Sequence, residues 1–182
     1  LKPSNILIDR HGLVKIADLG IARAVALDNA DDSVLRGTPA YMSPEQMTPG
    51  EIDGRADLFA LGALTYEMIV GKRLFTGGST YQLLAQIQTV EDLIFGSEFK
   101  DQINQIMPEM LPILTKCLRH SKDDRYLSAG SLLRDLRALP HFGGADLYTI
   151  IQAETLATTS QNLSYLTTLQ SSSSKTNLPE FN

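Results

Sequence analysis

The chain has 182 residues and a mass of 20.0 kDa, and 43% of its residues are hydrophobic, so it can bury a domain core and lacks the composition of a disordered protein. Its 16 Lys and Arg residues against 21 Asp and Glu residues give a net charge of −5, which argues against a nucleic-acid partner. The richest apolar run, residues 58–70, is interrupted by Thr65 and Glu67 and is shorter than the roughly 18 residues of a membrane span. Since the single cysteine, Cys117, cannot form an internal disulfide, we expect a small buried side chain in a protein of the reducing cytoplasm.

The chain divides near residue 140 into a folded domain and a tail. Residues 1–140 show dense apolar periodicity with turns marked by Gly and Pro, whereas residues 141–182 are rich in Ser and Thr and include the serine run 171–174. We therefore expect a Ser/Thr-rich linker or tail over residues 141–182. Apolar residues recur within it at spacings of three and four, which predicts one or two short helices there: Leu147, Ile150, Ile151, Leu163, Leu166 and Leu169.

The domain begins with a predicted β-hairpin. Two short runs of branched apolar residues, 6–8 and 13–16, flank a turn that contains Gly12. Residues 21–49 then lose periodicity and gain Asp, Gly and Pro. They predict a long irregular segment of a length that is usually functional inside a compact domain.

A central helix is predicted over residues 55–71. Its sequence is apolar on nearly all sides, which is typical of a helix that runs through the middle of a domain rather than along its surface. We therefore expect Tyr66 and Met68, which lie on this helix, to pack in the core.

Three further helices are predicted downstream. Ser79 and Ser128 are expected to cap helices over residues 79–88 and 128–139, and residues 108–119 form another amphipathic pattern. The apolar stripe of the last helix consists of Leu132, Leu133, Leu136 and Leu139. The predicted fold class is therefore mainly α, with one small hairpin at its start.

Several short motifs follow one another in a specific order. Residues 1–5 read Leu-Lys-Pro-Ser-Asn, and Asp18-Leu19-Gly20 comes directly after the predicted hairpin. Residues 37–45 read Gly-Thr-Pro-Ala-Tyr-Met-Ser-Pro-Glu, and Asp57 and Arg125 complete the series. Each motif alone is weak, but the ordered set resembles the C-terminal lobe of the eukaryotic-type protein kinases over residues 1–140. The middle motif is most similar to that of the serine/threonine kinases of bacteria.

The resemblance implies a site for ATP and Mg²⁺. Phosphoryl transfer needs hard oxygen ligands for Mg²⁺ and a cation near the γ-phosphate. By resemblance, Asn5 and Asp18 bind the magnesium ions that accompany ATP, and Lys2 points its ammonium toward the γ-phosphate. Thr38 is implied to form hydrogen bonds around the catalytic loop and to shape the substrate site. Leu19 stands where the family usually has Phe, which preserves an apolar side chain.

Other matching residues are implied to be structural. Gly20 would act as the hinge of the activation segment, the irregular stretch that follows it. Glu45 and Arg125 would form a buried ion pair that holds the end of that segment on the helical lobe, and Asp57 would accept backbone hydrogen bonds from the catalytic loop. Residues 121–122 are Ser-Lys where the family often has Asp-Pro, and we interpret this difference as drift.

The same motifs bear on the substrate. They resemble the serine/threonine branch of the family rather than the tyrosine branch, so protein Ser and Thr hydroxyls are the expected acceptors. Between Gly20 and Gly37 the only hydroxyl residue is Ser33, which makes it the candidate for an activating phosphorylation, with an ordinary exposed loop serine as the alternative.

Simpler interpretations exist for single residues and for the whole chain. Taken alone, Asn5 is a turn residue and Asp18 ends a strand. The family's catalytic Asp would stand directly before Leu1, and its N-terminal lobe is absent from this sequence, so we expect kinase activity in the full-length protein and none in the 182 residues alone. The alternatives are a pseudokinase-like or truncated scaffold that binds partners through the helical lobe, and an unrelated helical module. Retention of the full motif set favours the enzyme: Lys2, Asn5, Asp18, Thr38, Glu45 and Arg125.

Overall fold

The computed structural model describes residues 1–17 and 39–140. The predicted tail over residues 141–182 and its short helices lie outside these residues. The hairpin residues 7–15 belong to a different compact unit from residues 1–6, 16–17 and 39–140, and we describe each unit by itself.

The predicted hairpin is confirmed. A short 3-10 turn, η1 (Pro3–Asn5), leads into β1 (Ile6–Ile8), which pairs with β2 (Val14–Ile16) in a two-stranded antiparallel sheet. In the connecting turn the Asp9 carboxylate accepts hydrogen bonds from the backbone N–H groups of His11 and Leu13, at 2.8 and 3.0 Å. These two hydrogen bonds hold the pKa of Asp9 below its usual range.

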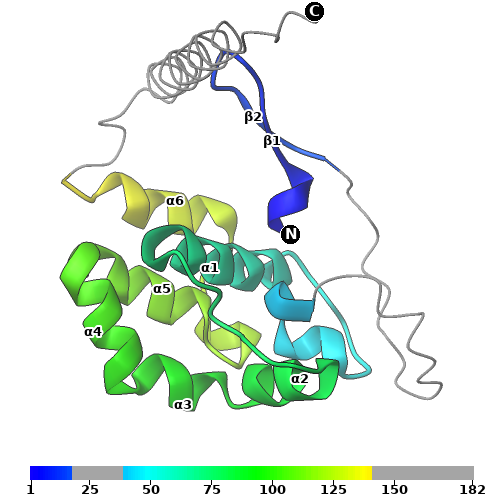
Figure 1. The fold of residues 1–182 in the computed structure, drawn as a ribbon. Coiled ribbons are helices and arrows are strands. Elements are labelled where there is room, and N and C mark those ends of the chain that lie inside the picture. Colours follow the sequence, from blue (N-terminus) through cyan, green and yellow to red (C-terminus); the bar gives the residue numbers. More distant parts are fainter. Residues whose placement is uncertain (18–38, 141–182) are drawn as a thin grey trace, which may run out of the picture. The chain divides into compact units, whose positions relative to one another are not determined.

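The described part of the chain is mainly helical (Figure 1). Its α-helices are α1 (Arg55–Val70), α2 (Thr80–Gln88), α3 (Val90–Phe95), α4 (Ser97–Ile106), α5 (Leu111–Cys117) and α6 (Ala129–Arg137). Its other 3-10 turns are η2 (Pro39–Tyr41), η3 (Pro44–Met47), η4 (Pro108–Met110) and η5 (Lys122–Asp124). The sequence did not predict α3 and α4, whereas the other four α-helices coincide with predicted ones.

Helix α1 is the centre of the helical unit, as predicted. It packs against α4, α5 and η2, and Figure 1 shows it running between α5 and α6. Tyr66 is buried, but the expectation for Met68 is wrong, because 74% of that residue is exposed. Two positions along an α-helix turn the side chain by roughly 200°, so Tyr66 and Met68 face opposite sides. At this end of α1 the described residues cover the side of Tyr66 and leave Met68 exposed.

The close approach of α1 to α5 depends on a glycine. A Cβ atom added to Gly62 would lie 2.8 Å from the Cβ of Cys117, a separation too short for two carbon atoms. Cys117 is 2% exposed, and burial raises the pKa of its thiol to about 12. The thiol therefore behaves as a small apolar side chain, as the sequence predicts.

The predicted helix caps are present. The side-chain oxygen of Ser79 accepts a hydrogen bond from the backbone N–H of Gln82, and Ser128 forms a reciprocal capping box with Ser131. Helix α1 ends at Gly71, whose φ of +75° lies in the left-handed region that glycine adopts without strain.

The apolar stripe of α6 is largely confirmed. Leu132 is buried, and Leu136 and Leu139 pack partly against the same core, whereas Leu133 is 38% exposed. Among residues 1–17 and 39–140 we find no helix with the length and apolar character that crossing a membrane requires.

Candidate functional site

A tight backbone turn joins two of the predicted site residues, Lys2 and Asn5. Lys2 is extended, and Pro3, whose ring fixes its backbone φ, starts the 3-10 turn η1. The backbone N–H of Asn5 closes this turn by donating to the carbonyl of Lys2 at 3.0 Å. Lys2 and Asn5 therefore lie at the two ends of a single turn that leads into β1.

The second strand of the hairpin, β2, leads the chain back to Asn5. The backbone N–H of Ala17 donates to the carbonyl oxygen of Asn5 at 2.7 Å, and Ala17 directly precedes Asp18 in the sequence. The hydroxyl of Ser4 lies 3.4 Å from the side-chain oxygen of Asn5. The hairpin thus brings Asn5 beside the residue that leads into the second predicted metal ligand.

Four predicted site residues lie outside the described residues: Asp18, Gly20, Ser33 and Thr38. Their roles stay predictions. Within residues 1–17 and 39–140, no group of three or more His, Cys, Asp and Glu side chains is arranged to hold a metal ion. The metal-binding roles of Asn5 and Asp18 are likewise predictions that these residues leave open to test.

Arg125 and Glu45 form a buried ion pair. The Nη1 and Nη2 atoms of Arg125 lie 2.7 and 2.8 Å from the two carboxylate oxygens of Glu45, which is a bidentate arrangement. The side chain of Arg125 is 0% exposed and that of Glu45 is 15% exposed. Glu45 belongs to η3 and Arg125 follows η5, so the pair joins segments that are 80 residues apart.

The remaining hydrogens of this guanidinium also have acceptors. Arg125 donates to the backbone carbonyls of Arg119 (2.7 Å), His120 (2.8 Å) and Arg55 (3.1 Å). Since an arginine has five N–H donors, the two bonds to Glu45 and these three satisfy all of them. The guanidinium carbon also lies 4.9 Å from the centre of the Phe59 ring.

We predict a pH dependence of stability at this pair. Burial raises the pKa of Glu45, but the hydrogen bonds and charge of Arg125, with smaller contributions from the Glu45 backbone N–H and Ser43, outweigh it and leave the pKa below its ordinary value. When the pKa of a carboxyl group is lower in the folded chain than in the unfolded chain, the ionised group stabilises the fold at every pH above the unfolded-state pKa. This stabilisation is lost as the pH falls through the folded-state pKa. In urea unfolding between about pH 7 and about pH 3, the free-energy difference between the parent chain and Glu45→Gln should therefore shrink below about pH 4.5. A difference that is constant over this range would contradict the assignment.

Asp57, in the first turn of α1, accepts a hydrogen bond from the chain ahead of the hairpin. Its Oδ1 lies 3.3 Å from the backbone nitrogen of Leu1. The predicted role of Asp57 is to accept backbone hydrogen bonds from this loop, and the contact joins the start of α1 to the Lys2 turn.

The structure adds a contact that the sequence did not predict. The hydroxyl of Tyr41, which is 5% exposed, donates to Glu67 of α1, and the same carboxylate lies 3.8 Å from the Nε atom of Arg73. Burial, followed by the hydrogen bond to Glu67, raises the pKa of Tyr41. Together with the Glu45–Arg125 pair, this contact fixes residues 39–47 on the helical unit at two points.

The structure shows a second feature that we did not predict, although the sequence contains a pattern for it: the hydrogen bonds between Ser43 and Gln46. The side-chain oxygen of Gln46 accepts hydrogen bonds from both the backbone N–H and the hydroxyl of Ser43, at 2.9 and 3.2 Å. Ser at the start of a helical turn followed three residues later by Gln is the sequence pattern of a capping box. Ser43 is fully buried, so this turn is an internal part of the segment that carries Glu45.

Comparisons with known proteins agree with this geometry. The model of the protein kinase domain matches residues 1–135. The serine/threonine-protein kinase PknL of Mycobacterium tuberculosis is 36% identical over 140 residues, which are 76% of this chain and 34% of that protein. The probable serine/threonine-protein kinase SCO3848 of Streptomyces coelicolor is 35% identical over 141 residues, 76% of this chain and 20% of that protein. The serine/threonine-protein kinase PknB of Mycolicibacterium smegmatis is 34% identical over 141 residues, 75% of this chain and 22% of that protein. The chain thus spans between about a fifth and a third of the length of these relatives.

Proposed function

Because this chain belongs to the protein kinase domain family, we propose that the whole protein transfers the γ-phosphate of ATP to Ser and Thr hydroxyls of protein substrates. The relatives at 34 to 36% identity are named serine/threonine-protein kinases, which supports this acceptor class. The motif set of Lys2, Asn5 and the Glu45–Arg125 pair favours an enzyme over a scaffold, since a scaffold needs only the pair.

The observation that carries the proposal is the Lys2–Asn5 turn and its hydrogen bond to Ala17. An amide oxygen is a hard ligand of the kind that Mg²⁺ prefers, so the donor set of Asn5 with Asp18 fits a magnesium ion. Bound Mg²⁺–ATP supplies the phosphoryl group and neutralises part of its charge. The chain's own contribution is a turn that fixes the backbone positions from which the Asn5 and Lys2 side chains extend before the nucleotide arrives.

The other residues of the motif set act on the activation segment. We propose that Gly20 is its hinge, that Thr38 shapes the substrate site, and that Ser33 is phosphorylated on activation. The two anchors of residues 39–47, Glu45 to Arg125 and Tyr41 to Glu67, then hold the end of this segment in place.

The exposed face of the hairpin is consistent with a further part of the kinase domain. Branched apolar residues of the hairpin are about half exposed or more: Leu7, Ile8, Leu13, Val14 and Ile16. So many exposed apolar side chains on so short a hairpin indicate an interaction surface. We propose that the N-terminal lobe of the kinase domain covers it in the whole protein.

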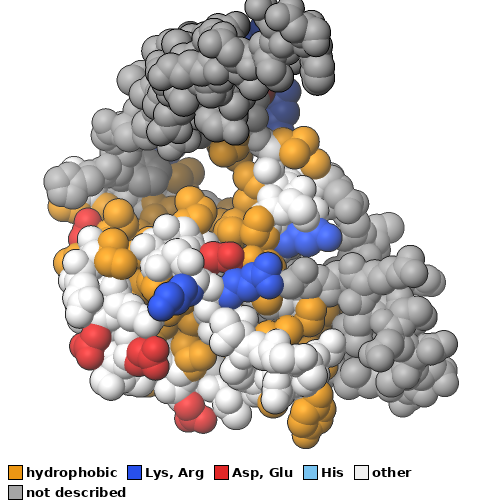
Figure 2. Space-filling model, in the orientation of Figure 1, with side chains coloured by type: hydrophobic (Ala, Val, Ile, Leu, Met, Phe, Trp, Pro, Cys, Tyr) orange, Lys and Arg blue, Asp and Glu red, His pale blue; other side chains and the backbone are white. Residues whose placement is uncertain are grey.

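The charge pattern agrees with protein substrates rather than nucleic acid. The net charge is −5, and on the face that Figure 2 shows the Lys and Arg side chains do not form a continuous basic area. Use of ATP and a single unpaired cysteine favour a cytoplasmic location for this domain.

Activity of the whole protein tests the proposal through Asn5. We expect Asn5→Ala to lower the rate of Mg²⁺-dependent phosphate transfer from radiolabelled ATP to casein at least about tenfold, because one hard oxygen ligand is lost. Phosphoamino-acid analysis of the product should show phosphoserine and phosphothreonine.

Asn104→Ala is the matched control, since Asn104 is exposed on α4, away from the Lys2–Asn5 turn. Its rate should equal that of the parent protein. A parent protein that folds but neither binds Mg²⁺–ATP nor labels any protein would reject the enzyme and leave the pseudokinase-like scaffold.

A further inference from the structure

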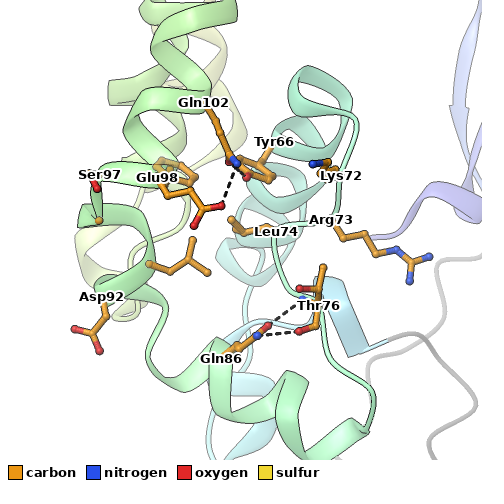
Figure 3. Close-up of a pocket in the computed structure, with 13 residues that line it drawn as sticks. Tyr66, Lys72, Arg73, Leu74, Thr76, Gln86, Asp92, Ser97, Glu98 and Gln102 are labelled. Atoms are coloured by element: carbon orange, nitrogen blue, oxygen red, sulfur yellow. Dashed lines mark hydrogen bonds between the residues drawn. The ribbon is translucent and has the colours of Figure 1, made fainter.

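A pocket of about 500 Å³ lies in the helical unit between the end of α1, the loop of residues 72–76 and the helices α2 to α4 (Figure 3). None of the predicted catalytic, metal-binding or structural residues lines it. Its walls come in part from α3 and α4, the two helices that the sequence did not predict. The pocket is therefore a feature separate from the Lys2–Asn5 turn.

A chain of hydrogen bonds orients one carboxylate in this pocket. The hydroxyl of Tyr66, which is 6% exposed, donates to the side-chain oxygen of Gln102, and the amide nitrogen of Gln102 donates to Glu98 at 3.3 Å. Burial and then the nearby charge of Glu98 raise the pKa of Tyr66, so the hydroxyl stays protonated and remains a donor. Figure 3 shows the Glu98 carboxylate turned toward the interior of the pocket.

This carboxylate has no cationic partner in the described part of the chain. The ion pairs among residues 1–17 and 39–140 do not include Glu98. Arg73 pairs with Glu67 at 3.8 Å, and its guanidinium points out of the pocket in Figure 3, as does the carboxylate of Asp92. Glu98, which is exposed, is therefore the carboxylate that Figure 3 shows facing the pocket, and Lys72 also belongs to the lining.

The pocket is lined by polar and charged side chains and, in part, by apolar and aromatic ones. Leu74, Leu93 and Phe99 line the pocket with Tyr66, and the rings of Tyr66 and Phe99 stack with their centres 5.3 Å apart. A carboxylate beside this apolar part of the wall suits a long side chain that packs its methylene stem and pairs its charged end. A guanidinium suits this site better than an ammonium, because it can bind both carboxylate oxygens and also stack on rings.

We propose that this pocket binds an arginine side chain presented by a partner protein, with Glu98 as the residue that pairs with the guanidinium. The volume of about 500 Å³ exceeds what one side chain fills, so apolar residues that flank the arginine also enter the pocket. The Tyr66–Gln102 hydrogen-bond chain holds Glu98 in its orientation before binding, which reduces the entropy that binding costs. The proposal concerns binding only and does not depend on phosphoryl transfer.

A peptide titration of the 182-residue chain tests the site. The probe is the acetylated and amidated peptide Gly-Leu-Arg-Leu-Gly, and the readout is the backbone amide NMR spectrum of the labelled chain. We expect saturable shifts confined to residues 72–76 and 93–102. Glu98→Gln should weaken binding at least about tenfold, since it removes a charge-assisted pair. Asp101→Asn is the matched control, because Asp101 is exposed on the same helix but does not line the pocket, and it should leave the affinity unchanged.

Two further peptides test the charge that the pocket prefers. Replacement of the arginine by citrulline keeps the shape and removes the charge, and it should weaken binding at least about tenfold. Equal binding of the citrulline peptide, or no saturable binding of the arginine peptide, would overturn the proposal. A third result would also overturn the proposal: a peptide with Glu in place of Arg binds more tightly than the arginine peptide, and Lys72→Gln abolishes that binding. The pocket would then be a site for an anion.

Discussion

Arg125→Met should destabilise the chain by about 3–5 kcal/mol, the typical result of removing one partner of a buried ion pair. The substitution leaves the Glu45 carboxylate, which is 15% exposed, without a cation. It also leaves the carbonyls of Arg119, His120 and Arg55 without the donors that they have in the parent chain. Urea unfolding followed by far-UV circular dichroism measures the loss. Because a domain is stable by only about 5–15 kcal/mol, this variant will be close to its unfolding threshold.

The order of a small set of variants distinguishes this explanation from a general effect of mutation. Glu45→Gln should cost less than Arg125→Met, since an amide oxygen still accepts from the guanidinium and the three carbonyls keep their donors. Arg134→Met is the matched control, because Arg134 is exposed and forms no ion pair within the described residues. It should change the free energy of unfolding by less than about 0.5 kcal/mol. Equal losses for Arg125→Met and Arg134→Met would show that the buried pair has no special role.

Phe59→Ala is expected to cost about 3–5 kcal/mol, the range for a fully buried aromatic side chain replaced by alanine. Phe59 is 0% exposed, and its ring stacks on that of Phe75 with the centres 6.0 Å apart. The same ring lies against the Arg125 guanidinium at 4.9 Å, so its removal also exposes the ion pair to water. Thermal and urea unfolding should both show the loss, and the acid sensitivity assigned to Glu45 should change with it.

Met68→Ala on the same helix is the control. Met68 is 74% exposed, so the substitution should alter the free energy of unfolding by less than about 0.5 kcal/mol. If Phe59→Ala cost as little as is expected of Met68→Ala, the place of this face of α1 at the centre of the core would be contradicted.

Local rules predicted the elements that depend on local contacts. The hairpin follows from two short branched runs around Gly12, and its turn is closed by hydrogen bonds within residues 9–13. Ser79 and Ser128 mark the starts of α2 and α6 because a serine side chain accepts the N–H of a residue only three positions on. Because these interactions join residues that are close in sequence, they can be predicted without the tertiary structure.

The helices α3 and α4 escaped prediction for physical reasons. Neither begins with a side-chain cap, and Gly96, which separates them, is a residue that disfavours helices. Helix α3 has only six residues, too few for a helix that is stable by itself. What stabilises the two is burial of Val90, Ile94, Phe99 and Ile103 against the core, which is a tertiary effect.

The sequence by itself determined the mainly helical class, the hairpin and the ordered motifs that place this chain in the protein kinase domain family. These depend on residue type and spacing along the chain. Only the tertiary structure decided that Tyr41 binds Glu67, that five acceptors surround Arg125, and that Glu98 lines a pocket without an ion-pair partner among the described residues. Such contacts join side chains that are distant in sequence. Their energies depend on burial and on the three-dimensional distance between charges, neither of which a linear pattern specifies.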